Sequence, residues 1–106
     1  MSIGTVSATV TVHKESGIVS VPITIGNGTA FSGFTSGMSI GTLPSGFRPA
    51  ATRTADVDCR DNGVWASANY ATAIVQVDSS GDVKLFGNQT AIQTMKYISG
   101  SIMFVI

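Results

Sequence analysis

One short segment, residues 60–65, combines the side-chain types that recognise a ring with polar edges. It reads Arg-Asp-Asn-Gly-Val-Trp and holds the only tryptophan of the chain. A sugar ring presents an apolar face and a rim of hydroxyls, so an indole can stack on the face while Arg, Asp and Asn bond the rim. The alternative is that Trp65 fills the core. The candidate saccharide site predicted from these residues consists of Trp65, Asp61, Arg60, Asn62 and Tyr70.

Two residues are candidates for nucleophilic or acid–base chemistry. His13 is the only histidine and Cys59 the only cysteine. A triad needs a histidine beside both other members, and the spacing does not bring Cys59 to His13. His13 is typical of a surface residue at a hairpin, and Cys59 shares a strand face with Val57, which predicts a small core residue. We therefore expect a binding protein without a cofactor; an esterase or glycosidase remains an alternative without a convincing catalytic group.

Asp56, Asp58 and Asp61 superficially resemble the start of a calcium loop. The twelfth position is Ser67 when counted from Asp56 and Asn69 when counted from Asp58, so neither register supplies the bidentate glutamate of such loops. Asp56 and Asp58 lie on one strand face only about 7 Å apart, which does not favour a glycosidase pair either. We expect no metal site.

The elements that carry these residues are strands. Apolar residues alternate with polar ones, as in residues 5–12 and 18–25, and Gly, Asn, Asp and Ser punctuate the runs. Pro22 predicts an edge or a bulge in its strand, residues 26–34 a loop with two aromatics, and residues 90–95 a short helix. The pattern predicts one all-β domain over 1–106, an antiparallel jelly-roll-like β-sandwich or barrel of about 7–8 strands. The expected strands are 4–13, 18–26, 37–43, 51–59, 64–68, 70–78, 82–87 and 97–105.

Composition narrows the partners. Charged residues make up 11% of the chain, and six Lys and Arg balance six Asp and Glu, so we expect no nucleic acid partner. No apolar run reaches 18 residues, so we expect no membrane insertion, and Met1–Gly4 shows no leader-like pattern. A neutral surface rich in Ser, Thr and Gly is poorly protected against association, which favours an oligomer.

Residues 41–49, Gly-Thr-Leu-Pro-Ser-Gly-Phe-Arg-Pro, resemble the Leu-Pro-x-Gly-aromatic-Arg-Pro turn in C-terminal domains of many tailed-phage fibre and baseplate proteins. Residues 73–85 resemble the paired strands with a glycine turn that follow it, so the resemblance spans roughly residues 37–106. In physical terms, Pro44 stops a strand, Gly46 permits a left-handed residue, Phe47 covers the sandwich end and Arg48 bonds carbonyls left unpaired there. We expect this motif to be architectural.

The length and the closing strand are similar to the receptor-binding head domains of lactococcal siphophages. That resemblance implies a homotrimer at the tail tip of a virion, which contacts other tail or baseplate proteins, is assembled in the host cytoplasm and acts outside the cell. It implies binding of a bacterial cell-surface saccharide through Trp, Asp, His and Arg side chains, which adds His13 to the candidate site. The alternative is a purely structural tail or fibre domain that makes only protein contacts.

Overall fold

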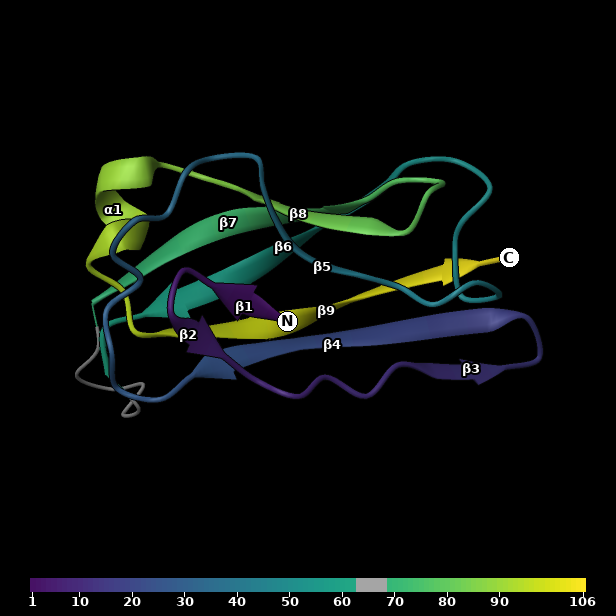
Figure 1. Cartoon of the computed structure of the whole chain (residues 1–106), viewed down its shortest axis with the longest axis horizontal. Coiled ribbons are helices and arrows are strands. Elements are labelled where there is room, and N and C mark those ends of the chain that lie inside the picture. The colour runs from purple at the N-terminus through teal and green to yellow at the C-terminus, as the bar shows by residue number, and fades with distance from the viewer. Residues whose placement is uncertain (63–68) are drawn as a thin grey trace.

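The computed structural model describes residues 1–62 and 69–106. The described residues fold almost entirely into antiparallel strands (Figure 1). In chain order the elements are β1 (Ser2–Ile3), β2 (Val6–Ser7), β3 (His13–Glu15), β4 (Ile18–Gly26), β5 (Met38–Thr42), β6 (Arg53–Arg60), β7 (Tyr70–Val77), β8 (Asp82–Phe86), α1 (Gln89–Gln93) and β9 (Tyr97–Val105). The predicted all-β sandwich or barrel is therefore confirmed; the strand expected over 64–68 lies outside the described residues.

Seven strands form one sheet in the order β3-β4-β9-β6-β7-β8-β5, and β1 and β2 form a separate hairpin. β6 pairs with β7 along its whole length but with β9 only through Asp58–Arg60. The sheet therefore curls over at β6, with β3, β4 and β9 on one side and β7, β8 and β5 on the other (Figure 1). The core fills the space between these two sides.

The core follows from the alternation read in the sequence. In β4 every second side chain is buried, and its outward neighbours are half-buried or exposed. The same period holds in the C-terminal half of β6 and along β7, β8 and most of β9, because successive side chains of a strand point to opposite faces. The inward residues of β4 are Val19, Val21, Ile23 and Ile25.

The start of the chain departs from the prediction of a single strand over 4–13. Gly4 adopts a positive φ of 59° and closes a tight turn, so that Ile3 pairs with Val6 in the β1-β2 hairpin. The alternation of this segment is real, since Val6 is buried and Val10 packs partly against the core. The alternation of apolar and polar residues therefore predicts which side chains face the core, but it does not predict whether the backbone pairs with a neighbouring strand.

The connection between β3 and β4 is also shorter than expected. His13–Glu15 belongs to β3, and the turn consists of Ser16 and Gly17, with φ of 52° and 77°. Positive φ at both central residues is the two-residue hairpin turn whose twist matches the flanking strands. β3 pairs only with Ile18–Ser20, so β4 is a sheet edge at Pro22 on that side, and the expected edge position of Pro22 is confirmed.

The Leu-Pro-Ser-Gly-Phe-Arg-Pro segment has the architectural role predicted for it. Gly46 has a φ of 92°, and the half-buried Phe47 packs against the core. Arg48 Nε donates to the carbonyl of Leu43 at 3.0 Å. Lys14 fastens the turn to β3, because its Nζ donates to the Gly46 carbonyl at 2.9 Å and lies 5.7 Å from the centre of the Phe47 ring.

Two further elements agree with the sequence. The glycine-rich loop after β4 buries both of its aromatic residues, Phe31 and Phe34. The helix α1 begins after Asn88, whose side-chain oxygen accepts from the Ala91 amide and caps it. Across the residues that the structure describes, no helix is long and apolar enough to span a membrane.

Candidate functional site

Two tyrosines flank an arginine on the outward face of three neighbouring strands. Arg60 in β6 is the register partner of Tyr97 in β9 and of Tyr70 in β7. Side chains at paired positions point to the same face, with Cβ atoms about 4.5–5.5 Å apart. The row Tyr97–Arg60–Tyr70 therefore places two tyrosines on either side of one arginine, across about 10 Å of sheet. Tyr70 is 73% exposed.

A second, polar row lies two residues further along the same face. Asp58 pairs with Ser99 in β9 and with Thr72 in β7. Asp58 and Thr72 are exposed and Ser99 is half-buried. Hydroxyls both donate and accept hydrogen bonds, and a carboxylate accepts them. Together the two rows form a platform, which we call the tyrosine platform: Tyr97, Arg60, Tyr70, Ser99, Asp58 and Thr72.

Tyr97 owes its place to a glycine in the next strand. Gly26 in β4 is its register partner, and a Cβ built on Gly26 would lie 2.5 Å from Tyr97 Cδ1. The ring also passes near Gly28, where a Cβ would lie 3.6 Å from the Tyr97 hydroxyl. Tyr97 therefore lies over the bare backbone of Gly26. The sequence prediction missed Tyr97, because only the order β4-β9-β6 brings it beside Arg60.

Asp61 directly follows β6, and its carboxylate and backbone amide form hydrogen bonds with Asn69, just before β7. Its Oδ1 accepts from the Asn69 amide at 2.9 Å, its Oδ2 accepts from Asn69 Nδ2 at 2.8 Å, and its own amide donates to the Asn69 carbonyl at 3.0 Å. Both carboxylate oxygens thus serve to join the ends of residues 61–69. Asn62 is half-buried beside it. Trp65 lies outside the described residues.

His13 is not brought to the other predicted site residues. It pairs with Ser20 in β4, which pairs with Met103 in β9. Met103 is six residues from Tyr97 along β9, a distance of about 20 Å at the usual rise of a strand. The structure therefore joins Arg60 and Tyr70 directly, sets Asp61 and Asn62 next to them in the chain, and places His13 at the opposite end of the sheet.

The remaining candidates for chemistry are also placed. Cys59 is fully buried, as predicted, and desolvation by burial, with a smaller contribution from the charge of Asp58, raises the pKa of its thiol to about 12. A thiol that stays protonated is a poor nucleophile. Within residues 1–62 and 69–106, no three His, Cys, Asp or Glu side chains gather as a metal site would require.

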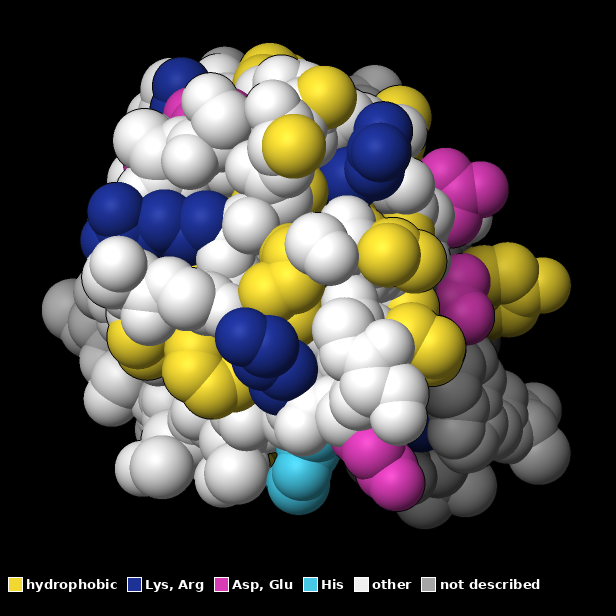
Figure 2. Space-filling model, turned by 90° about the vertical axis from the view of Figure 1, so that its right-hand side faces the viewer, with side chains coloured by type: hydrophobic (Ala, Val, Ile, Leu, Met, Phe, Trp, Pro, Cys, Tyr) yellow, Lys and Arg dark blue, Asp and Glu magenta, His cyan; other side chains and the backbone are white. Residues whose placement is uncertain are grey.

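The charges on the surface are dispersed. On the end of the molecule shown in Figure 2, the described Lys and Arg side chains are spread among neutral and hydrophobic ones.

A scan against models of protein families finds none that matches this chain, and a search of curated proteins finds no relative.

Proposed function

We propose that this chain is a saccharide-binding module that recognises a bacterial cell-surface polysaccharide, as a phage receptor-binding head does. The observation that carries the proposal is the row Tyr97–Arg60–Tyr70 on one outward sheet face. An exposed phenol ring at this end of the sheet offers a flat apolar surface, and the neighbouring guanidinium and carboxylate supply donors and acceptors for hydroxyls.

Recognition by such a platform is weak for each copy. Hydrogen bonds that compete with water contribute about 0.5–1.5 kcal/mol each, and affinities from millimolar to micromolar correspond to about 4–8 kcal/mol. Function then depends on several copies acting together, because linked sites raise apparent affinity by about 10²–10⁴-fold. We infer a homotrimer carried on a virion tail, where it contacts other tail proteins; sedimentation should give about three times the chain mass of 10.9 kDa.

A second candidate function is a structural tail domain that makes only protein contacts. It is favoured by exposed apolar side chains at the other end of the same face, where Ile18 pairs with Val105 and Met103 lies nearby. These side chains are 43–67% exposed. Exposed apolar patches of this kind mark contact surfaces in many proteins.

A glycan array followed by titration separates the two. We expect binding of wall saccharides by the native chain, and a dissociation constant at least about fivefold higher for Tyr70→Ala, since truncating an aromatic anchor of a binding site costs more than about 1 kcal/mol. Ile74→Ala is the matched control, because Ile74 is 44% exposed on the same face of β7 but lies outside the platform. Equal losses in both variants, or no glycan binding by the native chain, would favour the structural function.

A further inference from the structure

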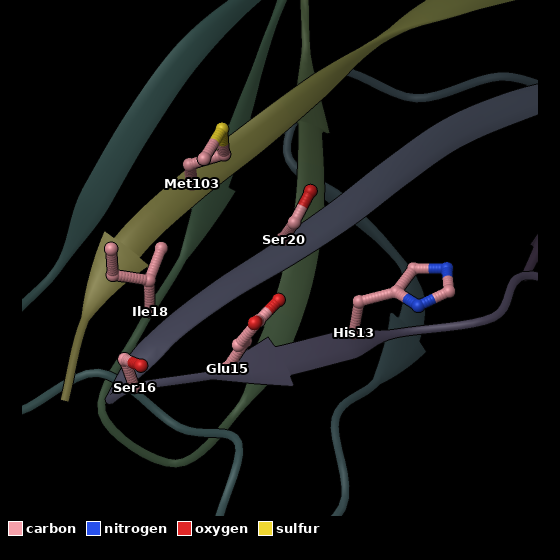
Figure 3. Close-up of a pocket in the computed structure, with 6 residues that line it drawn as sticks. All are labelled: His13, Glu15, Ser16, Ile18, Ser20 and Met103. Carbon is pink, nitrogen blue, oxygen red and sulfur yellow. The ribbon is translucent and has the colours of Figure 1, made fainter.

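A shallow hollow lies on the outward face at the end of the sheet opposite the tyrosine platform. Its volume is about 360 Å³, within the range of small-ligand sites. Its side chains come from three adjacent strands and the turn that joins two of them (Figure 3). The lining residues are His13, Glu15, Ser16, Ile18, Ser20 and Met103.

The register explains why the face is hollow here. His13, Ser20 and Met103 form one row across β3, β4 and β9, with the shortest side chain in the middle. The outer two strands lie about 9.5 Å apart, twice the usual strand spacing. Ser20 lies on the middle strand, between Met103 on one side and His13 on the other, and the His13 ring extends away from the other labelled residues (Figure 3). In the neighbouring row Glu15 pairs with Ile18, which gives the hollow an apolar floor beside a carboxylate.

No Lys, Arg or His side chain among the described residues forms an ion pair with Glu15. Lys14 follows His13 in β3, but its Nζ is held at the Gly46 carbonyl and over the Phe47 ring, away from the hollow. The hollow therefore combines one negative charge, two hydroxyls and an apolar floor, and its chemistry is complementary to a cation on an apolar body.

We propose that this hollow binds a primary ammonium group carried on a compact ring, as in a hexosamine with a free amino group. The ammonium has three donors; one bonds the Glu15 carboxylate and the others reach the hydroxyls of Ser16 and Ser20, while the ring packs on Ile18 and Met103. This site is separate from the tyrosine platform, so it holds whether or not the platform binds saccharide.

The Met103 methyl group is the probe for the test. Protein labelled with ¹³C in its methionine methyl groups is titrated with glucosamine and, separately, with glucose, which has the same ring without the amine. We expect a saturable shift of the Met103 signal with glucosamine and an affinity about fivefold lower for glucose, the upper value for an exposed ion pair. The signals of the buried Met95 and of the distant Met38 should stay in place.

Three variants make the test specific. Glu15→Gln keeps the shape and removes the charge, so the preference for glucosamine over glucose should vanish; Ser20→Leu fills the hollow and should abolish the shift. Asp56→Asn makes the same charge change on an exposed position of β6 and should leave the preference intact. Equal shifts with the two sugars, or a preference that survives Glu15→Gln, would overturn the proposal. A Met103 shift that follows protein concentration and ignores glucosamine would instead assign the hollow to a second copy of the chain.

Discussion

Replacing Gly26 by alanine should disturb both the fold and the tyrosine platform. A Cβ at this position would lie 2.5 Å from Tyr97 Cδ1, 2.7 Å from the Lys96 carbonyl oxygen and 2.9 Å from Tyr97 Cα. A side chain can rotate away from a new methyl group, but two of these three atoms belong to the backbone of Lys96 and Tyr97, where β9 begins. β4 and β9 must therefore move apart at this end.

The expected cost follows from that geometry. Forcing an extra methyl into a filled space destabilises a protein by about 1–3 kcal/mol, and each kcal/mol lowers the melting temperature of a domain this size by about 4 °C. Thermal unfolding followed by circular dichroism measures this cost. We expect a loss of about 4–12 °C together with weaker saccharide binding.

Thr24→Ala is the control, because Thr24 lies two residues away on the same exposed face of β4 and surface changes of this kind stay within about 0.5 kcal/mol. A Gly26→Ala protein as stable as the native chain would refute the reasoning, since it would mean that the strands do not approach as closely as the register implies. Normal saccharide binding by a clearly destabilised variant would remove Tyr97 from the platform.

Two further predictions concern residues next to the platform. Because burial raises the pKa of Cys59 from 9.0 to about 12, the folded chain holds a proton that the unfolded chain releases, so the free energy of unfolding should fall as the pH rises from 9 toward 12. Urea unfolding at pH 8 and pH 10 measures this fall. An equal fall in the Cys59→Ala variant would contradict the assignment to Cys59. Asp61→Ala should lower stability by about 1 kcal/mol, because it removes the acceptors of two Asn69 donors; an unchanged melting temperature would instead free Asp61 for a direct role in binding.

Most of the strands were accessible from the sequence because alternation and turn residues agree in them. The limits of β4 and β9 match the predicted ranges of 18–26 and 97–105 closely. The first strand was wrong in part, because alternation records burial, and Ala8, Val10 and Val12 pack against the core without joining a ladder. Gly4 was the signal for the turn that was overlooked.

The candidate site was accessible only in part. Arg60 and Tyr70 were predicted together because Tyr70 begins the next expected strand after the Arg60–Trp65 segment, and the register pairs the two residues directly. Tyr97 and Ser99 join them only through the pairing of β6 with β9, a contact between segments far apart in the chain. No local pattern encodes such a pairing. The same reason hid the hollow at His13, whose third strand is β9.

The position of β9 also governs the order in which the molecule can form. β9 lies between β4 and β6, so neither of its partners is its neighbour in the chain, and Ile18 must find Val105 across almost the whole sequence. Bringing such distant segments together costs loop entropy before any contact rewards it, so all-β domains of this kind fold over about milliseconds to seconds. Until β9 inserts, β4 and β6 expose open edges that invite pairing with other chains. We therefore expect aggregation during folding to increase with protein concentration, because partly folded chains with open β4 and β6 edges can then pair with one another.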